Sequence, residues 1–363
     1  MDMTALRSDA RQTAGATPRP DRSALEPCPL HVEDISQARL ERGLDAHVLA
    51  CLRYGRDAGG PADPRVVPIP LRRLDGAGAA ELWISAEPVD IGMSEGIHHA
   101  SNRSVLFGSL HLAERDLATI ERSVLRAYVR IDQVLNRLGY PHWLRVWNYL
   151  ARINDGPGDE ERYRQFSLGR HHALALKPGF ERELPAATAI GTDGEGLTIC
   201  FLAGREAALQ VENPRQVSAF RYPREYGPRS PSFSRATLQH WRDSSVLFVS
   251  GTSSVVGHAT LHPGDAARQL EETLANIEAL LGNAARLHLG DAPPSGFSPE
   301  AFKLYVRAPE LFAAVEPIVR RRLQARAPVA VLQGDICRTD LALEVEAVFR
   351  WQPHSDAPQG PAR

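Results

Sequence analysis

Apolar and polar positions alternate along the chain with two different periods. Short runs rich in β-branched and aromatic residues predict strands, and they read VVPIPL, ELWISA, LTICFLA, SVLFVSG and LALEVEAVF. An apolar stripe with helical spacing predicts helices over residues 119–138 and 265–281. Strand and helix patterns follow one another over most of the chain, which indicates an α+β protein.

The two ends of the chain lack this periodicity. Residues 1–28 are polar and contain prolines, and residues 352–363 have the same character. Segments that cannot bury apolar surface do not offset the entropy lost on folding. We therefore expect a disordered tail at each end.

A short apolar run occurs twice. VLFGS at residues 105–109 returns as VLFVS at residues 246–250, and each copy is followed by a predicted helix, a strand and a closing apolar strand. The shared order of elements indicates two related α+β units. We place the first at residues 29–215 and the second, which carries the candidate acid, at residues 216–351.

Composition and charge restrict the classes of function. Of the 363 residues 43% are hydrophobic and 24% charged, and the net charge is −2, which argues against a nucleic acid or an anionic membrane as partner. No stretch approaches the roughly 18 unbroken apolar residues of a membrane span, and the N-terminus lacks a signal-type segment, so we expect a cytoplasmic protein. Four scattered cysteines without a CxxC pair give no indication of a metal site.

The densest polar segment is the arginine loop, residues 213–236, which reads NPRQVSAFRYPREYGPRSPSFSRA. Its prolines stiffen the backbone, and the guanidinium groups match carboxylates bidentately. One interpretation is a surface loop whose arginines pair with Glu212 and Glu225. The other is a site for a small dicarboxylate, since these two acids cannot neutralise the five arginines of the loop, Arg215, Arg221, Arg224, Arg229 and Arg235.

The last predicted strand places Glu344 and Glu346 on one face. On an exposed strand these are the polar side of an amphipathic sheet. On a cleft, desolvation would raise a carboxyl pKa toward neutrality and allow general acid catalysis. Nearby Cys337 is either a core thiol or a wall of the same pocket.

Other segments offer weaker signals. SGTSSVVGH, residues 250–258, is either a tight turn or a place where backbone amides approach a ligand. WNYLARIND supplies Asn148 and Tyr149, and ERYRQF supplies Tyr163, as hydrogen-bonding and aromatic groups for a ring substrate. Such side chains also pack commonly in cores.

Three motifs resemble the YjgF/RidA superfamily, namely YGPRSPSFSRA followed by VLFVSGT, then RQLEETLANIEALL, then CRTDLALEVEAVF. The resemblance implies two fused YjgF/RidA-like, chorismate-mutase-like units, each a mixed sheet packed by helices. Trimers are usual in that superfamily, so either a monomer or a trimer is expected.

A narrower resemblance, to the chorismatase/3-hydroxybenzoate synthase family, covers residues 80 to 350. It is carried by RVWNYLARIN, GDEERYRQF, FLAGR, VENPRQVSAFRYPREYGPRSPSFSRA and VSGTSSVVGHATLHPGD. It implies a secondary-metabolism enzyme that removes pyruvate from chorismate without metal or organic cofactor. Glu344 matches the acid that protonates the enolpyruvyl group, and Gly251 and Cys337 match the members that form 3-hydroxybenzoate. The substrate-binding residues expected are Asn148, Tyr149, Tyr163, Arg215, Tyr222, Tyr226 and Arg229.

Three alternatives stay open. A hydrolytic chorismatase would give a dihydroxycyclohexadiene carboxylate, and 4-hydroxybenzoate is a possible second product of the aromatic type. A RidA-type imine deaminase needs an arginine about 15 residues before the glutamate, where this chain has Val329, with Arg326 nearby. The third is a protein that binds chorismate without turnover.

Overall fold

The computed structural model describes residues 28–36, 40–55, 63–76, 79–289 and 294–352. The predicted tails, 1–28 and 352–363, lie outside these residues except for Cys28 and Gln352. No helix in these ranges is both long and apolar enough to cross a membrane.

The core of the molecule consists of two six-stranded mixed sheets with the same strand order. In each sheet the first five strands in spatial order pair antiparallel with their neighbours, and the sixth pairs parallel with the fifth, as β9 with β8 or β17 with β16. The first sheet contains, in spatial order, β5 (Asp90–Ser94), β6 (Ile97–Ser101), β7 (Val105–Leu112), β10 (Leu197–Gly204), β8 (His142–Ala151) and β9 (Ala186–Thr192). The second contains β11 (Leu209–Val211), β12 (Ala236–His240), β13 (Ser245–Thr252), β18 (Leu343–Trp351), β16 (Phe297–Val306) and β17 (Val329–Gln333).

The repeated pentapeptide occupies equivalent places in these sheets. VLFGS begins β7 and VLFVS lies in β13, and each strand is third in its sheet beside the closing strand, β10 or β18. The α+β class and the mixed sheets packed by helices are therefore confirmed. The second sheet begins at Leu209, near the predicted boundary between the units.

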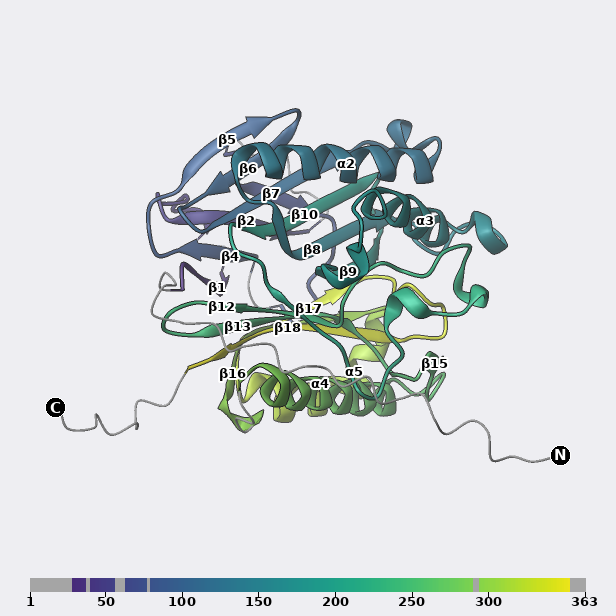
Figure 1. Cartoon of the computed structure of the whole chain (residues 1–363). Coiled ribbons are helices and arrows are strands. Elements are labelled where there is room, and N and C mark those ends of the chain that lie inside the picture. Colours follow the sequence, from purple (N-terminus) through teal and green to yellow (C-terminus); the bar gives the residue numbers. More distant parts are fainter. Residues whose placement is uncertain (1–27, 37–39, 56–62, 77–78, 290–293, 353–363) are drawn as a thin grey trace, which may run out of the picture.

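Helices cover the outer face of each sheet. In Figure 1, α2 (Ile120–Leu138) and α3 (Arg162–Leu174) lie above the first sheet, and α4 (Ala266–His288) and α5 (Phe312–Val319) lie below the second. Helix α4 begins at the cap Asp265, whose carboxylate accepts from the Arg268 backbone amide. It continues past the predicted end at residue 281 because Ala284 and Ala285 extend its buried stripe.

A third, four-stranded sheet precedes these units, within the range that the sequence assigned to the first unit. Its order is β1 (Leu30–Ile35), β4 (Ala80–Ser85), β2 (Val48–Tyr54) and β3 (Val66–Ile69). A single apolar cluster joins all three sheets and contains Trp83, Phe107, Trp147, Phe248 and Tyr305. The inner faces of the sheets are therefore buried against one another, and polar groups on those faces lie away from bulk water.

Candidate active site

The seam between the two six-stranded units contains a cavity of about 490 Å³. Helix α3 and strand β9 form its wall on the first unit, and the arginine loop, the end of β13 and the segment before β18 form the wall on the second. The polar and aromatic lining includes Tyr163, Arg164, Arg170, Thr188, Gln216, Tyr222, Tyr226, Arg235, Ser253, Cys337, Arg338 and Glu344. Neither unit forms this cavity alone.

Hydrogen bonds across the seam fix the end of β13 to β9. The Ser250 hydroxyl accepts from the Ala187 amide at 2.8 Å and donates to the Ser234 carbonyl at 2.5 Å. The Gly251 amide donates to the Thr188 hydroxyl at 3.0 Å. Each of these bonds joins a side chain to a backbone group. Together they set the position of Gly251, although β13 and β9 do not pair as neighbouring strands of one sheet.

The pairing of β13 with β18 is interrupted at the same place. Val249 and Thr252 keep partners on β18, but the register shifts between them. Such bulges re-aim side chains and are frequent beside active sites. Here the irregularity brings the Gly251 backbone against the Glu344 carboxyl, because a Cβ on Gly251 would lie 1.8 Å from Glu344 Oε1.

Glu344 projects from β18 into the cavity and is 5% exposed. Its Oε2 accepts a hydrogen bond of 3.3 Å from the Ser253 hydroxyl. Burial, reinforced by the negative charge of Glu346, raises the pKa of Glu344 from 4.5 to about 8. At neutral pH this carboxyl is mostly protonated and can donate a proton to a bound molecule.

Glu346, two residues further along β18, behaves in the opposite way. Burial alone would raise its pKa, but Lys303 and Arg145 lower it below its ordinary value. The two glutamates of one strand face thus have different protonation states, as in sites where environment separates an acid from a carboxylate.

Two titratable groups beside Glu344, the Cys337 thiol and the Tyr163 phenol, are neutral. Burial raises the pKa of the Cys337 thiol to about 12, and the charge of Glu344 adds to this effect. Burial likewise raises the pKa of Tyr163 well above its usual value. The wall beside the acid is therefore a thiol and a phenol, with no thiolate nucleophile.

Four arginines of the described ranges line the cavity, and one of them, Arg164, pairs with Glu161 at 3.2 Å. Arg170 on α3 is 3% exposed, and in the described part of the chain its Nε and Nη2 atoms have no hydrogen-bond partner. Arg235 donates to the Tyr222 hydroxyl and the Val217 carbonyl, each at 2.7 Å, while its buried Nε is unpartnered among the described residues. Buried donors of this kind are costly unless a ligand accepts from them.

Arg338 is held by aromatic rings of the arginine loop. Its guanidinium lies 3.9 Å from the ring centroid of Tyr226 and 5.1 Å from that of Tyr222. One amino group donates to the His258 carbonyl at 2.8 Å. Arg338 is therefore held at the cavity wall by contacts with two tyrosines that also line the cavity.

The structure brings together six of the ten residues that the sequence singled out for the site. These six line the cavity: Tyr163, Tyr222, Tyr226, Gly251, Cys337 and Glu344. The other four, Asn148, Tyr149, Arg215 and Arg229, do not line it.

The four remaining residues have other surroundings. Asn148 accepts from the Tyr128 hydroxyl at 2.6 Å and is fully buried, and Tyr149 is buried in the core between the sheets. Arg215 pairs with Glu272 on α4, and Arg229 is exposed. Among the loop arginines only Arg235 lines the cavity.

Sequence reasoning did not single out Arg170 or Arg338, and it noted Ser253 only as part of the segment 250–258. Arg170 follows ERYRQF by four residues, but a lone arginine in a helix carries no local signal of burial. Arg338 lies directly after Cys337, so the prediction that Cys337 belongs to the site could also have suggested Arg338.

Comparisons with known proteins agree on one family. A family model described as "Chorismatase FkbO/Hyg5-like, N-terminal" matches residues 81–203. A Streptomyces rapamycinicus protein named chorismatase is 39% identical over 280 residues, which cover 74% of this chain and 81% of that protein. A Streptomyces hygroscopicus protein named 3-hydroxybenzoate synthase is 35% identical over 276 residues, with coverages of 74% and 81%.

A solved structure extends the comparison to the fold. The crystal structure of a chorismatase superposes with a TM-score of 0.78 at 32% identity and covers 88% of this chain and 98% of that one. The similarity therefore includes both six-stranded units and the seam between them.

Proposed function

Because the chain belongs to the chorismatase family, we propose that it removes pyruvate from chorismate and releases 3-hydroxybenzoate. One observation carries the proposal: a carboxyl whose pKa is about 8 lies in a cavity lined by four arginines. An enol ether requires an acid to protonate it, and a dianionic substrate requires cations to hold it.

Arg170 and Arg235 bind the carboxylates of chorismate in this proposal. Both present buried N–H groups without partners in the described structure, and a carboxylate supplies two acceptor oxygens. Tyr222 and Tyr226, which also line the cavity, hold Arg235 and Arg338 in place. Positioning of this kind holds the enolpyruvyl group near Glu344.

Glu344 begins the reaction as an acid. Its proton passes to the methylene carbon of the enolpyruvyl group, and the adjacent carbon becomes part of an oxocarbenium ion. The bond between the ring C3 and the ether oxygen then breaks, and pyruvate leaves with that oxygen. The Glu344 carboxylate formed in the first step is available to take up the proton of the ring 4-hydroxyl.

The fate of the ring decides the product. In the 3-hydroxybenzoate route the 4-hydroxyl oxygen bonds to C3 and forms an arene oxide, which opens and loses a ring proton to become aromatic. No water is consumed. Cys337 and Gly251 support this route, because a thiol is a weak hydrogen-bonding group and a glycine has no side chain, so the wall beside the acid binds an attacking water poorly.

The experiment is incubation of the purified protein with chorismate, followed by chromatography of the ring products and an enzymatic assay of pyruvate. We expect equal amounts of pyruvate and 3-hydroxybenzoate. Absence of pyruvate would refute the function. Pyruvate together with a dihydroxycyclohexadiene carboxylate would refute the roles of Gly251 and Cys337 while retaining that of Glu344.

A further inference from the structure

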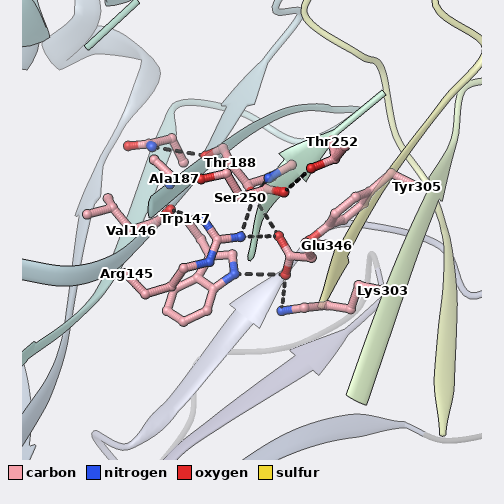
Figure 2. Close-up of polar contacts among 12 residues, drawn as sticks. Arg145, Val146, Trp147, Ala187, Thr188, Ser250, Thr252, Lys303, Tyr305 and Glu346 are labelled. Carbon is pink, nitrogen blue, oxygen red and sulfur yellow. Dashed lines mark hydrogen bonds and ion pairs between the residues drawn. The ribbon is translucent and has the colours of Figure 1, made fainter. Parts of the chain in front are cut away.

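A second carboxylate lies behind the cavity and is held by four donors. Glu346 is 3% exposed. Its Oε1 accepts from Trp147 Nε1 at 2.8 Å and from Lys303 Nζ at 2.7 Å, and its Oε2 accepts from Arg145 Nη2 and the Thr188 hydroxyl, each at 2.6 Å. Figure 2 shows these groups converging on the carboxylate. We call these five residues the Glu346 network.

Together with Glu81 of β4, the network is balanced in charge and joins three sheets. Lys303 on β16 also pairs with Glu81 of β4 at 3.0 Å, and the Trp83 indole donates to the same Glu81 oxygen at 2.8 Å. Two carboxylates, Glu81 and Glu346, therefore face two cations, Lys303 and Arg145. A buried set of this kind holds Glu346 ionised, because a proton on it would displace one of its donors.

The network reaches the acid through Thr188. The Thr188 hydroxyl donates to Glu346 and accepts from the Gly251 amide at 3.0 Å. Gly251 is the residue on whose backbone the Glu344 carboxyl lies, since a Cβ there would be 1.8 Å from Glu344 Oε1. The carboxylate of Glu346 thus fixes the backbone that seats the acid.

The network also acts on the acid through charge. The titratable and charged groups around Glu344 come from five segments and are Glu346 on β18, Arg145 on β8, Tyr163 on α3, Arg235 in the arginine loop, and Cys337 and Arg338 before β18. Arg145 and Arg235 favour the ionised form of Glu344, and the thiol and phenol are neutral. Of these groups, Glu346 supplies the negative charge that favours the protonated form.

We propose that Glu346 is a positioning residue of the reaction: its charge adds to burial in keeping Glu344 protonated near neutral pH, and its bond to Thr188 fixes the Gly251 seat. The inference rests on the proposed acid role of Glu344. A purely structural Glu346 would hold the sheets together without influencing how Glu344 titrates, and this difference can be measured.

The first test is the pH dependence of kcat for Glu346→Gln. An acid must be protonated to act, so wild-type activity is lost as pH rises through the pKa of Glu344, about 8. The substitution leaves Glu81 as the single carboxylate facing Lys303 and Arg145, and the excess positive charge favours the Glu344 carboxylate. We expect the basic limb of the pH profile, where kcat falls as pH rises, to move to lower pH by about one unit or more.

A charge-balanced variant serves as the control for misfolding caused by an unpaired buried charge. Lys303→Met/Glu346→Gln removes one cation and one anion and keeps Glu81 paired in charge with Arg145, and we expect its basic limb to move in the same direction by a smaller amount. Thr188→Val keeps all charges but breaks the link to Gly251, so kcat should fall about tenfold or more with the limb unmoved. Thr188→Ser should restore kcat.

A second readout needs no turnover. The difference in melting temperature between each protein and its Glu344→Gln derivative should grow with pH and level off at the pKa of Glu344 in that protein. The levelling point should be lower in the Glu346→Gln background. The inference would be overturned if, in the Glu346→Gln protein, both the basic limb of the kcat profile and the pH at which the melting difference levels off stayed within about 0.3 pH unit of wild type. If wild type releases no pyruvate, the proposed function fails, and the melting comparison still decides the role of Glu346.

Discussion

Replacement of Glu344 by glutamine should abolish most activity and stabilise the folded protein. Glutamine has the same shape but cannot donate a carboxylic proton, so kcat should fall about 100- to 10,000-fold, the usual contribution of a general acid. Because the Arg170 and Arg235 guanidinium groups are unchanged, chorismate should still bind.

The stabilisation follows from the raised pKa. Folding raises the pKa of Glu344 from 4.5 to about 8, mainly through burial. The stability associated with its proton is complete below pH 4.5 and is lost as pH rises to 8. Glutamine carries no such dependence, so the variant and wild type should be similar at pH 4.5. At pH 7 the variant should be more stable by roughly 3 kcal/mol.

For a chain of this length 3 kcal/mol corresponds to a rise in melting temperature of roughly 4 °C. The assay is calorimetry or circular dichroism at several pH values between 5 and 9, with Glu310→Gln, at an exposed glutamate, as the matched control. The control should follow wild type throughout. A Glu344→Gln protein that melts like wild type at pH 8, or that keeps more than a tenth of wild-type kcat, would refute the reasoning.

Gly251→Ala would place a Cβ 1.8 Å from Glu344 Oε1, so the carboxyl must move by about 1 Å; kcat should fall up to about 100-fold. Unchanged kinetics would mean that Gly251 does not seat the acid. Arg170→Met should raise KM for chorismate about 10- to 100-fold through loss of charge-assisted hydrogen bonds, whereas Arg229→Met, at an exposed arginine, should leave KM within about twofold. Equal effects of the two arginine variants would contradict the cavity assignment. The Cys337 thiol, with a pKa of about 12, should resist iodoacetamide at pH 7.5, as followed by mass spectrometry of the peptide; rapid labelling would show a thiolate.

Local pattern predicted the elements and their order well. The strands β7 and β13 are largely buried on both faces. A strand buried on both faces requires a nearly continuous apolar run, and VLFGS and VLFVS are such runs. The repetition of that run with the same following elements was enough to indicate two related units. The separate four-stranded sheet was not indicated, because its strands show the same pattern as those of the first unit and their partners are set by tertiary contacts.

The arginine loop shows where local reasoning stops. Neighbouring acids were the only partners visible in the sequence, yet Arg215 is neutralised by Glu272 on α4. Conversely, Arg170 lies far from the loop in sequence and faces the same cavity as Arg235. Pairing across long sequence separations depends on the packing of the two units, so the number of arginines was informative and their individual roles were not.

The two glutamates of β18 show both what the local pattern predicts and what depends on tertiary packing. The strand period alone placed Glu344 and Glu346 on one face, and the family resemblance assigned the acid to Glu344. Their opposite protonation states depend on groups from other parts of the chain, since Arg145 lies 201 residues from Glu346 and reaches it only across the seam. Desolvation and Coulomb interactions act through space over a few ångströms. The alternation of side chains along a strand is enough to show which carboxylates share a face. The packing of the sheets against one another leaves Glu346 ionised and Glu344 protonated.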